Sequence, residues 1–286
     1  RSVADAGLFR VDTDESHGRP ARASASASAR LQYSECPFDE YESTPFMSLG
    51  EIKALTFDTG GTILDWHTGL HAALAAAGVR HGVERDWHAL ANEFRRGALK
   101  RMLNHGEHGP ATMNIDDVHR ETLDRLLAEQ GLESFTPEER RSIWWDAIHG
   151  LQCWPDFPAA LPRLRAKFFC VSFTILSFRI IMDTARRNGL SWDAVVSCEA
   201  IGKYKLLPAA YLTCARYLQL DPGECCMVAC HNFDLNAAKS CGFKTAFVRR
   251  PDEWGADGPP DPEPDPRHDI VVDSFPELAL RLGAGS

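Results

Sequence analysis

The spacing of hydrophobic and polar residues differs between two parts of this chain. Between about residues 66 and 150, apolar residues recur every three or four positions, which predicts amphipathic helices. Four helical faces are marked by Leu70, Leu74 and Ala77; by Leu90, Phe94 and Leu99; by Val118, Leu123, Leu126 and Leu127; and by Ile143, Trp144, Ala147 and Ile148. We therefore expect an all-helical segment in this part of the chain.

Glycine, proline and capping residues predict the ends of these helices. Glycine and proline disfavour helix interiors. The helical pattern is therefore expected to break at Gly78, at the run Gly106-Glu-His-Gly-Pro110 and at Gly131. Thr136-Pro-Glu-Glu139 has the composition of a helix start, with a threonine cap, a proline in the first turn and a glutamate as capping-box partner.

Short apolar runs alternate with helical segments in the rest of the chain. The predicted strands are 52–58, Phe168–Phe173, Ala194–Ser197, Cys225–Cys230, Thr245–Val248 and Ile270–Val272, and the predicted helices between and after them are 178–188, 208–218, 233–241 and Pro276–Leu282. Strands that alternate with helices imply a parallel sheet with right-handed crossovers. We therefore predict an α/β fold with a Rossmann-like parallel sheet core and an inserted helical domain. Residues 251–268 contain six prolines and many acids and are predicted to form a surface loop.

These patterns also predict the domain organisation. Residues 1–46 have few large apolar residues and lack the continuous apolar core of a signal peptide, so we expect a disordered extension. Residues 47–65 and 155–286 are expected to form the core, and residues 66–154 the helical insert.

Composition excludes several classes of function. The 286 residues carry a formal net charge of -9 and contain no basic run, which argues against nucleic acid as a partner. No apolar stretch approaches the roughly 18 residues that cross a bilayer. Most of the nine cysteines lie in apolar segments and are predicted to be buried, reduced thiols of a cytoplasmic protein.

The candidate chemistry begins where the first predicted strand ends. The sequence Lys-Ala-Leu-Thr-Phe-Asp-Thr-Gly-Gly-Thr occupies residues 53–62. A strand that stops at Asp58 places this carboxylate at the carboxyl edge of the sheet, where open α/β sheets bind ligands. Gly60 and Gly61 allow a sharp turn and bring backbone N–H groups close to a bound anion. Asp58 is therefore a candidate covalent nucleophile.

This segment resembles the first motif of the haloacid dehalogenase superfamily, which includes dehalogenases, phosphatases and phosphonatases. The resemblance covers about residues 51–283 and identifies the helical insert with the cap domain of that superfamily. Phosphatases of the superfamily usually carry a second aspartate, a general acid, two positions after the nucleophile. This chain has Gly60 there, whereas dehalogenases often have a tyrosine.

Two further positions follow from the resemblance. Thr174 ends the second predicted strand, where a serine or threonine of the family hydrogen-bonds the bound anion or the nucleophile. Dehalogenases usually have an asparagine next, and this chain has Ile175. Lys205 lies in a segment that resembles the third motif, Tyr-Lys-Pro-Asp-Pro, with Leu206 and Leu207 in place of Pro-Asp. A cation there keeps the nucleophile ionised and stabilises developing negative charge.

The segment Val228-Ala-Cys-His-Asn-Phe-Asp234 resembles the fourth motif of the family. Phosphatases generally have two acids there that hold Mg²⁺ with the nucleophile, whereas this chain has only Asp234, with His231 near the position of the first acid. Histidine is a poor ligand for Mg²⁺, so Asp234 or His231 is instead expected to activate a water. Asp234 as a plain helix cap and His231 as a structural histidine are the alternatives. The order His-Asn-x-Asp is similar to that of dehalogenases active on small haloacetates.

Within the predicted cap, the segment that starts at Phe94-Arg-Arg resembles the dehalogenase sequence Trp-Arg-x-x-Gln, and Arg95 matches the substrate arginine of that family. Its planar guanidinium group suits a carboxylate or a departing halide. The alternative is a solvated basic face, because Arg96, Lys100 and Arg101 lie on the same predicted helix.

The resemblance therefore implies a hydrolytic 2-haloacid dehalogenase that works through an ester on Asp58, without metal or cofactor. The implied catalytic residues are Asp58, Thr174, Lys205, Asp234 and His231, and the implied substrate contacts are Arg95, Thr59, Gly60, Tyr211 and Asn232. A small haloacid is the expected partner, with neither nucleic acid nor membrane, and a homodimer is typical of similar dehalogenases. A Mg²⁺-dependent phosphatase or phosphonatase and a catalytically decayed binding protein are the alternatives.

Overall fold

The computed structural model describes residues 52–103, 114–259 and 261–284. The predicted disordered extension, residues 1–46, and the predicted helix break at 106–110 lie outside these ranges.

One parallel sheet forms the core and places the end of β1 at its centre. The strands are β1 (Ala54–Phe57), β2 (Phe169–Thr174), β3 (Ala194–Ser197), β4 (Cys225–Ala229), β5 (Lys244–Val248) and β6 (Ile270–Val272). Their order is β3-β2-β1-β4-β5-β6, and Phe57 at the end of β1 lies between Ser172 and Val228. The chain leaves β1 towards one side of the sheet and later returns to the other, so this end is a topological switch point, where ligands bind. The predicted α/β fold is confirmed.

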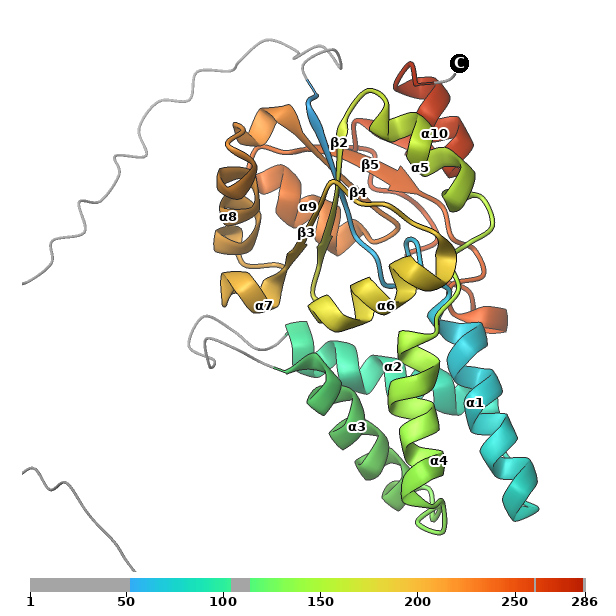
Figure 1. Cartoon of the computed structure of the whole chain (residues 1–286). Coiled ribbons are helices and arrows are strands. Elements are labelled where there is room, and N and C mark those ends of the chain that lie inside the picture. The colour runs from blue at the N-terminus through green and yellow to red at the C-terminus, as the bar shows by residue number, and fades with distance from the viewer. Residues whose placement is uncertain (1–51, 104–113, 260, 285–286) are drawn as a thin grey trace, which may run out of the picture. The chain divides into compact units, whose positions relative to one another are not determined.

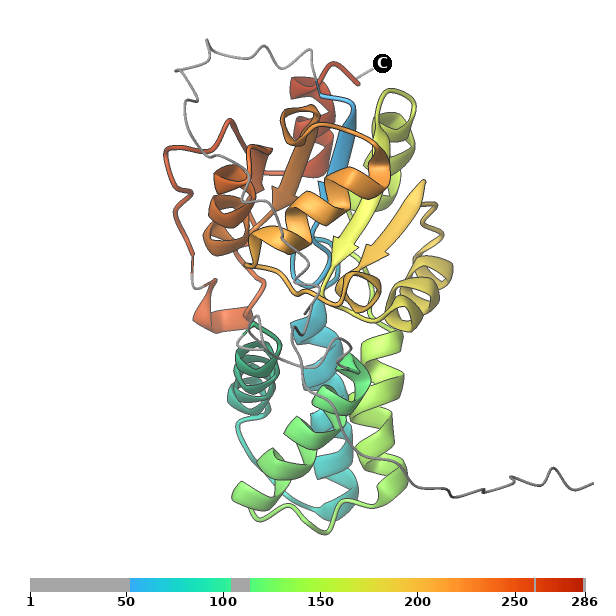
Figure 2. The ribbon, with the colours of Figure 1, turned by 90° about the vertical axis from the view of Figure 1, so that its left-hand side faces the viewer.

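Helices cover both faces of this sheet (Figures 1 and 2). They are α5 (Phe157–Arg165), α6 (Phe178–Asn188), the short α7 (Cys198–Ile201), α8 (Pro208–Leu218), α9 (Asn232–Ser240) and α10 (Phe275–Arg281). Helices α5 and α10 pack together on one face, and α8 and α9 pack together on the other. Because both faces are covered, the strands consist largely of apolar residues, as expected of a parallel sheet.

The insert between β1 and β2 is helical, as predicted. It comprises α1 (Trp66–His81), α2 (Trp87–Leu103), α3 (Ile115–Glu129) and α4 (Pro137–Arg141), which continues as a π-helix over Ser142–Ala147. The helices form a group beyond the carboxyl ends of the strands (Figure 2). We propose the boundaries 47–65, 66–154 and 155–286 for core, cap and core.

Two local predictions for the helices of the insert have opposite outcomes. The capping box at the start of α4 is confirmed, since Thr136 and Glu139 each accept a hydrogen bond from the other's backbone N–H. The predicted break at Gly78 is wrong, because α1 continues to His81. Gly78 has a packing role instead: a Cβ atom there would collide with the ring of Trp87. The glycine lets α1 and α2 approach closely.

The predicted surface loop 251–268 is only partly at the surface. Glu253 and Trp254 are buried, with exposed fractions of 1% and 7%. They precede a 3₁₀ turn at Gly255–Asp257. The loop therefore brings a buried carboxylate towards the inside of the protein.

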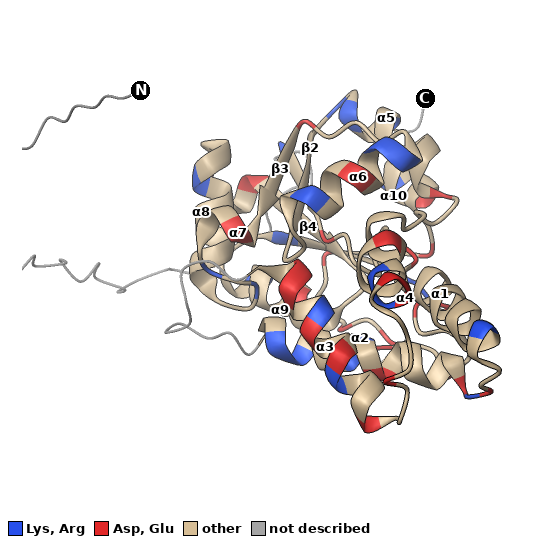
Figure 3. Cartoon of the chain, turned by 60° about the horizontal axis from the view of Figure 1, so that its bottom comes forward, with Lys and Arg blue, Asp and Glu red and all other residues tan. Residues whose placement is uncertain are grey.

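Charges of both signs are interspersed on the helices of the insert (Figure 3). Arg101 of α2 pairs with Glu121 of α3, and Arg120 pairs with Asp117 within α3. None of the helices that the structure describes is long and apolar enough to cross a membrane.

Candidate active site

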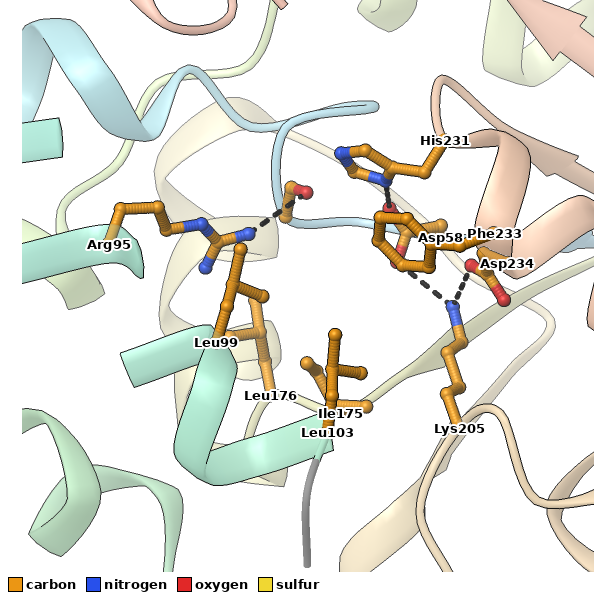
Figure 4. A pocket seen from close by; sticks show the side chains of 11 residues that line it. Asp58, Arg95, Leu99, Leu103, Ile175, Leu176, Lys205, His231, Phe233 and Asp234 are labelled. Atoms are coloured by element: carbon orange, nitrogen blue, oxygen red, sulfur yellow. Dashed lines mark hydrogen bonds and ion pairs between the residues drawn. The ribbon is translucent and has the colours of Figure 1, made fainter. Parts of the chain in front are cut away.

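Asp58 follows β1 directly and lies buried at the carboxyl edge of the sheet. Its side-chain Oδ1 accepts a hydrogen bond from Lys205 Nζ at 2.9 Å (Figure 4). Its Oδ2 accepts one from Thr62 Oγ1 at 2.8 Å. Burial alone raises the pKa of this carboxyl, but Lys205 and His231 together lower it well below its usual range. Asp58 is therefore ionised at neutral pH and held in a fixed orientation.

Lys205 joins Asp58 to a second buried carboxylate. Its Nζ donates to Asp234 Oδ2 at 2.8 Å, and the hydroxyl of Tyr211 donates to Asp234 Oδ1 at 2.6 Å. Burial disfavours the ammonium group, but the charges of Asp234 and Asp58 outweigh it and raise the pKa of Lys205. The next residue, Leu206, has a φ of 74°, an uncommon conformation for a bulky residue that is often associated with functional sites.

His231 lies between Asp58 and a carboxylate of the loop after β5. Its Nδ1 is 3.4 Å from Asp58 Oδ2, and its Nε2 is 3.1 Å and 3.2 Å from the two oxygens of Glu253. Burial disfavours the imidazolium, but Cys230, Glu253 and Asp58 favour it more strongly and raise the pKa of His231 well above its ordinary value. Burial raises the pKa of the Cys230 thiol, so this thiol keeps its proton and is uncharged. Glu253 and Asp58 are therefore the anions that stabilise the imidazolium of His231.

Arg95 lies on the opposite side of the pocket, on α2, with an exposed fraction of 7%. One terminal nitrogen donates to the carbonyl oxygen of Gly60 at 3.3 Å (Figure 4). The guanidinium carbon lies 5.4 Å from the ring centre of Trp66, within cation–π range. Its Nε is buried and has no hydrogen-bond partner among the described residues. Arg95 therefore keeps a donor available to a ligand.

The two glycines after Asp58 make room for side chains of the site. A Cβ atom on Gly60 would lie 3.0 Å from a terminal nitrogen of Arg95. Gly61 has a φ of 94°, and a Cβ atom there would collide with the carboxylate of Glu253. Larger residues at these positions would displace Arg95 or Glu253.

The structure brings the predicted threonines together, but a different threonine contacts Asp58. Thr59 Oγ1 donates to Thr174 Oγ1 at 2.7 Å, and Thr174 Oγ1 also accepts from the N–H of Leu176. The hydroxyl that reaches the Asp58 carboxylate is that of Thr62, which the sequence analysis did not select.

Two other predicted substrate contacts lie outside the pocket lining. Tyr211 is fully buried behind Asp234. The side chain of Asn232 is bonded to the loop after β5, since it accepts from the N–H of Asp265 and donates to the carbonyl of Glu263. Tyr211 therefore holds Asp234 in place, whereas Asn232 fixes the loop after β5.

A small pocket joins these groups (Figure 4). It is lined by Asp58, Gly60, Arg95, Leu99, Leu103, Ile175, Leu176, Lys205, His231, Phe233 and Asp234. The cavity measures about 20 Å³, which is room for about one water molecule. Charged groups on two opposite walls, together with leucine, isoleucine and phenylalanine side chains in the same lining, suit a small, partly apolar anion.

One group of described residues has the composition of a metal site. Ligand atoms of Cys230, His231 and Glu253 all lie within 4.8 Å of one another. The Cys230 thiol keeps its proton, and His231 is shared with Asp58. We therefore interpret the group as a hydrogen-bonded cluster.

Three residues of the site, Thr62, Trp66 and Glu253, are not predicted from the sequence. Thr62 and Trp66 lie in or just after the first motif, so their closeness to Asp58 was a usable signal. Glu253 is one acid in an acidic, proline-rich loop, and its neighbour Trp254 was the only local sign of burial.

Comparison with known proteins places these observations in a family. The model of haloacid dehalogenase-like hydrolases matches residues 52–242. The solved structure of a defluorinating L-2-haloacid dehalogenase is 33% identical, with a TM-score of 0.76, and the match covers 81% of this chain and 95% of that one. A second L-2-haloacid dehalogenase structure is 30% identical, with a TM-score of 0.74, over 82% of this chain and 99% of that one.

Curated relatives include two kinds of hydrolase. An (S)-2-haloacid dehalogenase of Xanthobacter autotrophicus is 28% identical over 208 residues, which are 70% of this chain and 76% of that one. A phosphoglycolate phosphatase of Aquifex aeolicus is 20% identical over 210 residues, 71% of this chain and 86% of that one.

Proposed function

Because the chain belongs to the haloacid dehalogenase-like hydrolases, we propose that it removes halide from short 2-haloacids through an ester on Asp58. The observation that carries the proposal is the buried, ionised Asp58, which lines one pocket with Arg95 and is held by Lys205 and Thr62. The similarity to a defluorinating L-2-haloacid dehalogenase and to an (S)-2-haloacid dehalogenase supports the same reaction.

Arg95 binds the carboxylate of the substrate. Arg95 lines the pocket, and its buried Nε has no partner among the described residues. A guanidinium group pairs with a carboxylate through two parallel hydrogen bonds. Leu99, Leu103 and Ile175 then surround the carbon chain and the halogen.

In the first step, an oxygen of Asp58 attacks the carbon that carries the halogen. The new C–O bond forms as the carbon–halogen bond breaks, and the halide leaves with the bonding electrons. Lys205 keeps Asp58 ionised and in line for the attack. Attack from behind inverts the configuration when that carbon is chiral.

In the second step, water attacks the carbonyl carbon of the Asp58 ester. Asp234 or His231 removes a proton from this water. The bond between the carbonyl carbon and the substrate oxygen then breaks and releases a 2-hydroxyacid. Asp58 returns to a carboxylate with one oxygen from water, and one halide and one proton are produced in each cycle.

A phosphatase is the second candidate, since a phosphoglycolate phosphatase is among the relatives. The residues present do not fit Mg²⁺, which prefers an octahedron of oxygen ligands. Lys205 and His231, both cationic, face the two oxygens of Asp58, and Asp234 already accepts from Lys205 and Tyr211. Gly60 also lacks the acid that would protonate a leaving group.

Halide release from chloroacetate, fluoroacetate and L-2-chloropropionate in the presence of EDTA tests the proposal, with Asp58→Asn as the control. We expect release by the wild-type protein and a loss of at least about 10⁴-fold in the variant. No release from any of the three acids would contradict the proposal. Mg²⁺-dependent phosphate release would then favour the phosphatase, and no release of either product would favour a decayed protein.

A further inference from the structure

We propose that Glu253 is a positioning residue that makes His231 the general base for hydrolysis of the Asp58 ester. The inference rests on the proposed function and deepens it, because it assigns the second step to His231 and gives a role to a buried residue of the loop after β5.

The geometry of Glu253 supports this role. Its carboxylate has an exposed fraction of 1% and faces His231 Nε2 with both oxygens. The indole N–H of Trp66 donates to Glu253 Oε1 at 3.1 Å, and the Cys230 thiol lies 3.7 Å from Oε2. The absence of a side chain on Gly61 leaves the space for this carboxylate. Glu253 is thus fixed from several sides and in turn fixes the His231 ring.

This contact also decides which nitrogen faces the reaction. A carboxylate that accepts from Nε2–H holds the imidazole in one tautomer, as the aspartate does in a serine protease triad. Nδ1 then points at Asp58, 3.4 Å from Oδ2. At this separation, a water placed to attack the Asp58 carbonyl carbon would be able to donate to this nitrogen.

Asp234 is less suited to the same task. Both of its carboxylate oxygens are occupied, one by Lys205 at 2.8 Å and the other by Tyr211 at 2.6 Å. Burial, together with the charge of Asp58, raises the pKa of Asp234 in spite of Lys205 and Tyr211, so what Asp234 lacks is an oxygen free to accept from a water. Its function in this arrangement is to hold Lys205 against Asp58.

The charge on His231 changes during the cycle in the direction that the chemistry needs. In the free enzyme, two carboxylates flank the ring and favour the imidazolium. Alkylation neutralises Asp58, so Nδ1 loses its anionic partner and releases its proton to solvent as the one net proton of the cycle, whereas Nε2–H stays bonded to Glu253. The neutral ring is then ready to accept a proton through Nδ1.

His231 Nδ1 carries protons between the attacking water and the departing group during hydrolysis of the ester. As the water oxygen bonds to the Asp58 carbonyl carbon, one water proton moves to Nδ1. When the bond to the substrate oxygen breaks, that proton passes to the departing alkoxide and completes the 2-hydroxyacid. The second water proton passes from the new carboxyl group of Asp58 to Nδ1. This step restores the imidazolium of His231 and the carboxylate of Asp58 together.

The Glu253→Gln variant tests the role of Glu253 in turnover. With chloroacetate we expect a rapid release of about one halide per enzyme, followed by turnover slower than wild type by about 10²-fold. Mass spectrometry should detect the Asp58 ester as the accumulated form. The matched control is Asp252→Asn, the exposed acid next to Glu253, which should behave as wild type. Unchanged turnover in Glu253→Gln, or equal slowing of both steps, would overturn the inference.

Nitrogen-15 NMR of the histidine side chains tests the proton positions without relying on that variant. We expect an imidazolium at His231 in the wild-type protein at pH 7.5. In Asp58→Asn, whose uncharged amide imitates the ester, we expect a neutral ring with its proton on Nε2. A proton on Nδ1 would overturn the assignment. If the wild-type protein forms no Asp58 ester and releases no halide, the proposed function fails, and the NMR result separately reports whether Glu253 holds the ring.

Discussion

The two walls of the pocket hold their charged groups in different ways. On the sheet side, Asp58 and Asp234 share Lys205, and Thr62 and Tyr211 occupy the remaining carboxylate oxygens. On the α2 side, Arg95 makes a single described hydrogen bond, to the carbonyl of Gly60, and its Nε has no described partner.

In the proposed function, this difference separates the groups assigned to the reaction from the group assigned to substrate binding. The charges of the sheet wall stabilise one another before any substrate arrives, and such preorganisation is a major source of catalysis. A buried donor without a partner costs free energy in the absence of ligand. In the proposed function a bound carboxylate removes that cost at Arg95, so we expect substrate binding and the reaction to depend on opposite walls.

Removal of Lys205 should have the largest effect, because it leaves two buried carboxylates without their shared cation. We expect Lys205→Met to lower the free energy of unfolding by about 3–5 kcal/mol at pH 7 and to abolish halide release. Urea denaturation measures the first effect. The control is Lys203→Met, two residues earlier and outside the pocket lining. If Lys205→Met and wild type had the same free energy of unfolding, Lys205 would not be the cation that stabilises the buried carboxylates of Asp58 and Asp234.

Substitution of Arg95 tests the opposite wall. Arg95→Lys keeps the charge but loses the two-pronged geometry, so we expect kcat/KM for chloroacetate to fall by about 10²-fold, mainly through KM. Arg96→Lys is the matched control, since Arg96 is exposed and points to Asp257. A similar loss in both variants, or a loss in kcat alone, would mean that Arg95 does not bind the substrate carboxylate.

The helical insert should carry a pH dependence of its own through His119. Burial and the nearby Arg95 lower the pKa of His119 to about 4, against about 6.5 in an unfolded chain. Between these values the unfolded state binds more protons, so stability should fall as the pH drops from about 6.5 to about 4. The expected loss is about 3 kcal/mol. Denaturation at several pH values should show a shallower fall in His119→Phe, and an identical fall would refute the assignment.

The smallest effect is expected for the hydroxyl that orients Asp58. Thr62→Val should lower kcat by about tenfold, because Lys205 still holds the other oxygen of the carboxylate. Thr174→Val should have a weaker effect, since the Thr174 hydroxyl bonds to Thr59 and Leu176. The reverse order in steady-state kinetics would restore the role that the family resemblance assigns to Thr174.

Much of the fold was predictable because its signals are local. The predicted bounds of Ala194–Ser197, Pro208–Leu218 and Ile270–Val272 agree with the structure, since continuous apolar runs and helical periodicity are read within a few residues. Gly78 was misinterpreted because the residue that requires it, Trp87, lies on another helix. Packing between helices leaves little trace in the sequence around a single glycine.

The residues of the site that follow the ends of strands were the ones predictable from the sequence. Asp58, Lys205 and Asp234 were selected from the sequence and lie within hydrogen-bonding distance in the structure. The sequence could not show which threonine reaches Asp58, because that depends on the exact path of the turn. Glu253 was missed because its burial results from a loop folding back onto the sheet edge.

The source of the oxygen in the product tests the central claim most directly. In H₂¹⁸O, with enzyme in excess over chloroacetate, we expect the glycolate of a single turnover to contain no ¹⁸O, because its new oxygen comes from Asp58. The label should appear in the Asp58 carboxylate, and mass spectrometry of the peptide that contains it would detect this. Glycolate labelled with ¹⁸O in the first turnover would show direct attack by water and contradict an ester on Asp58.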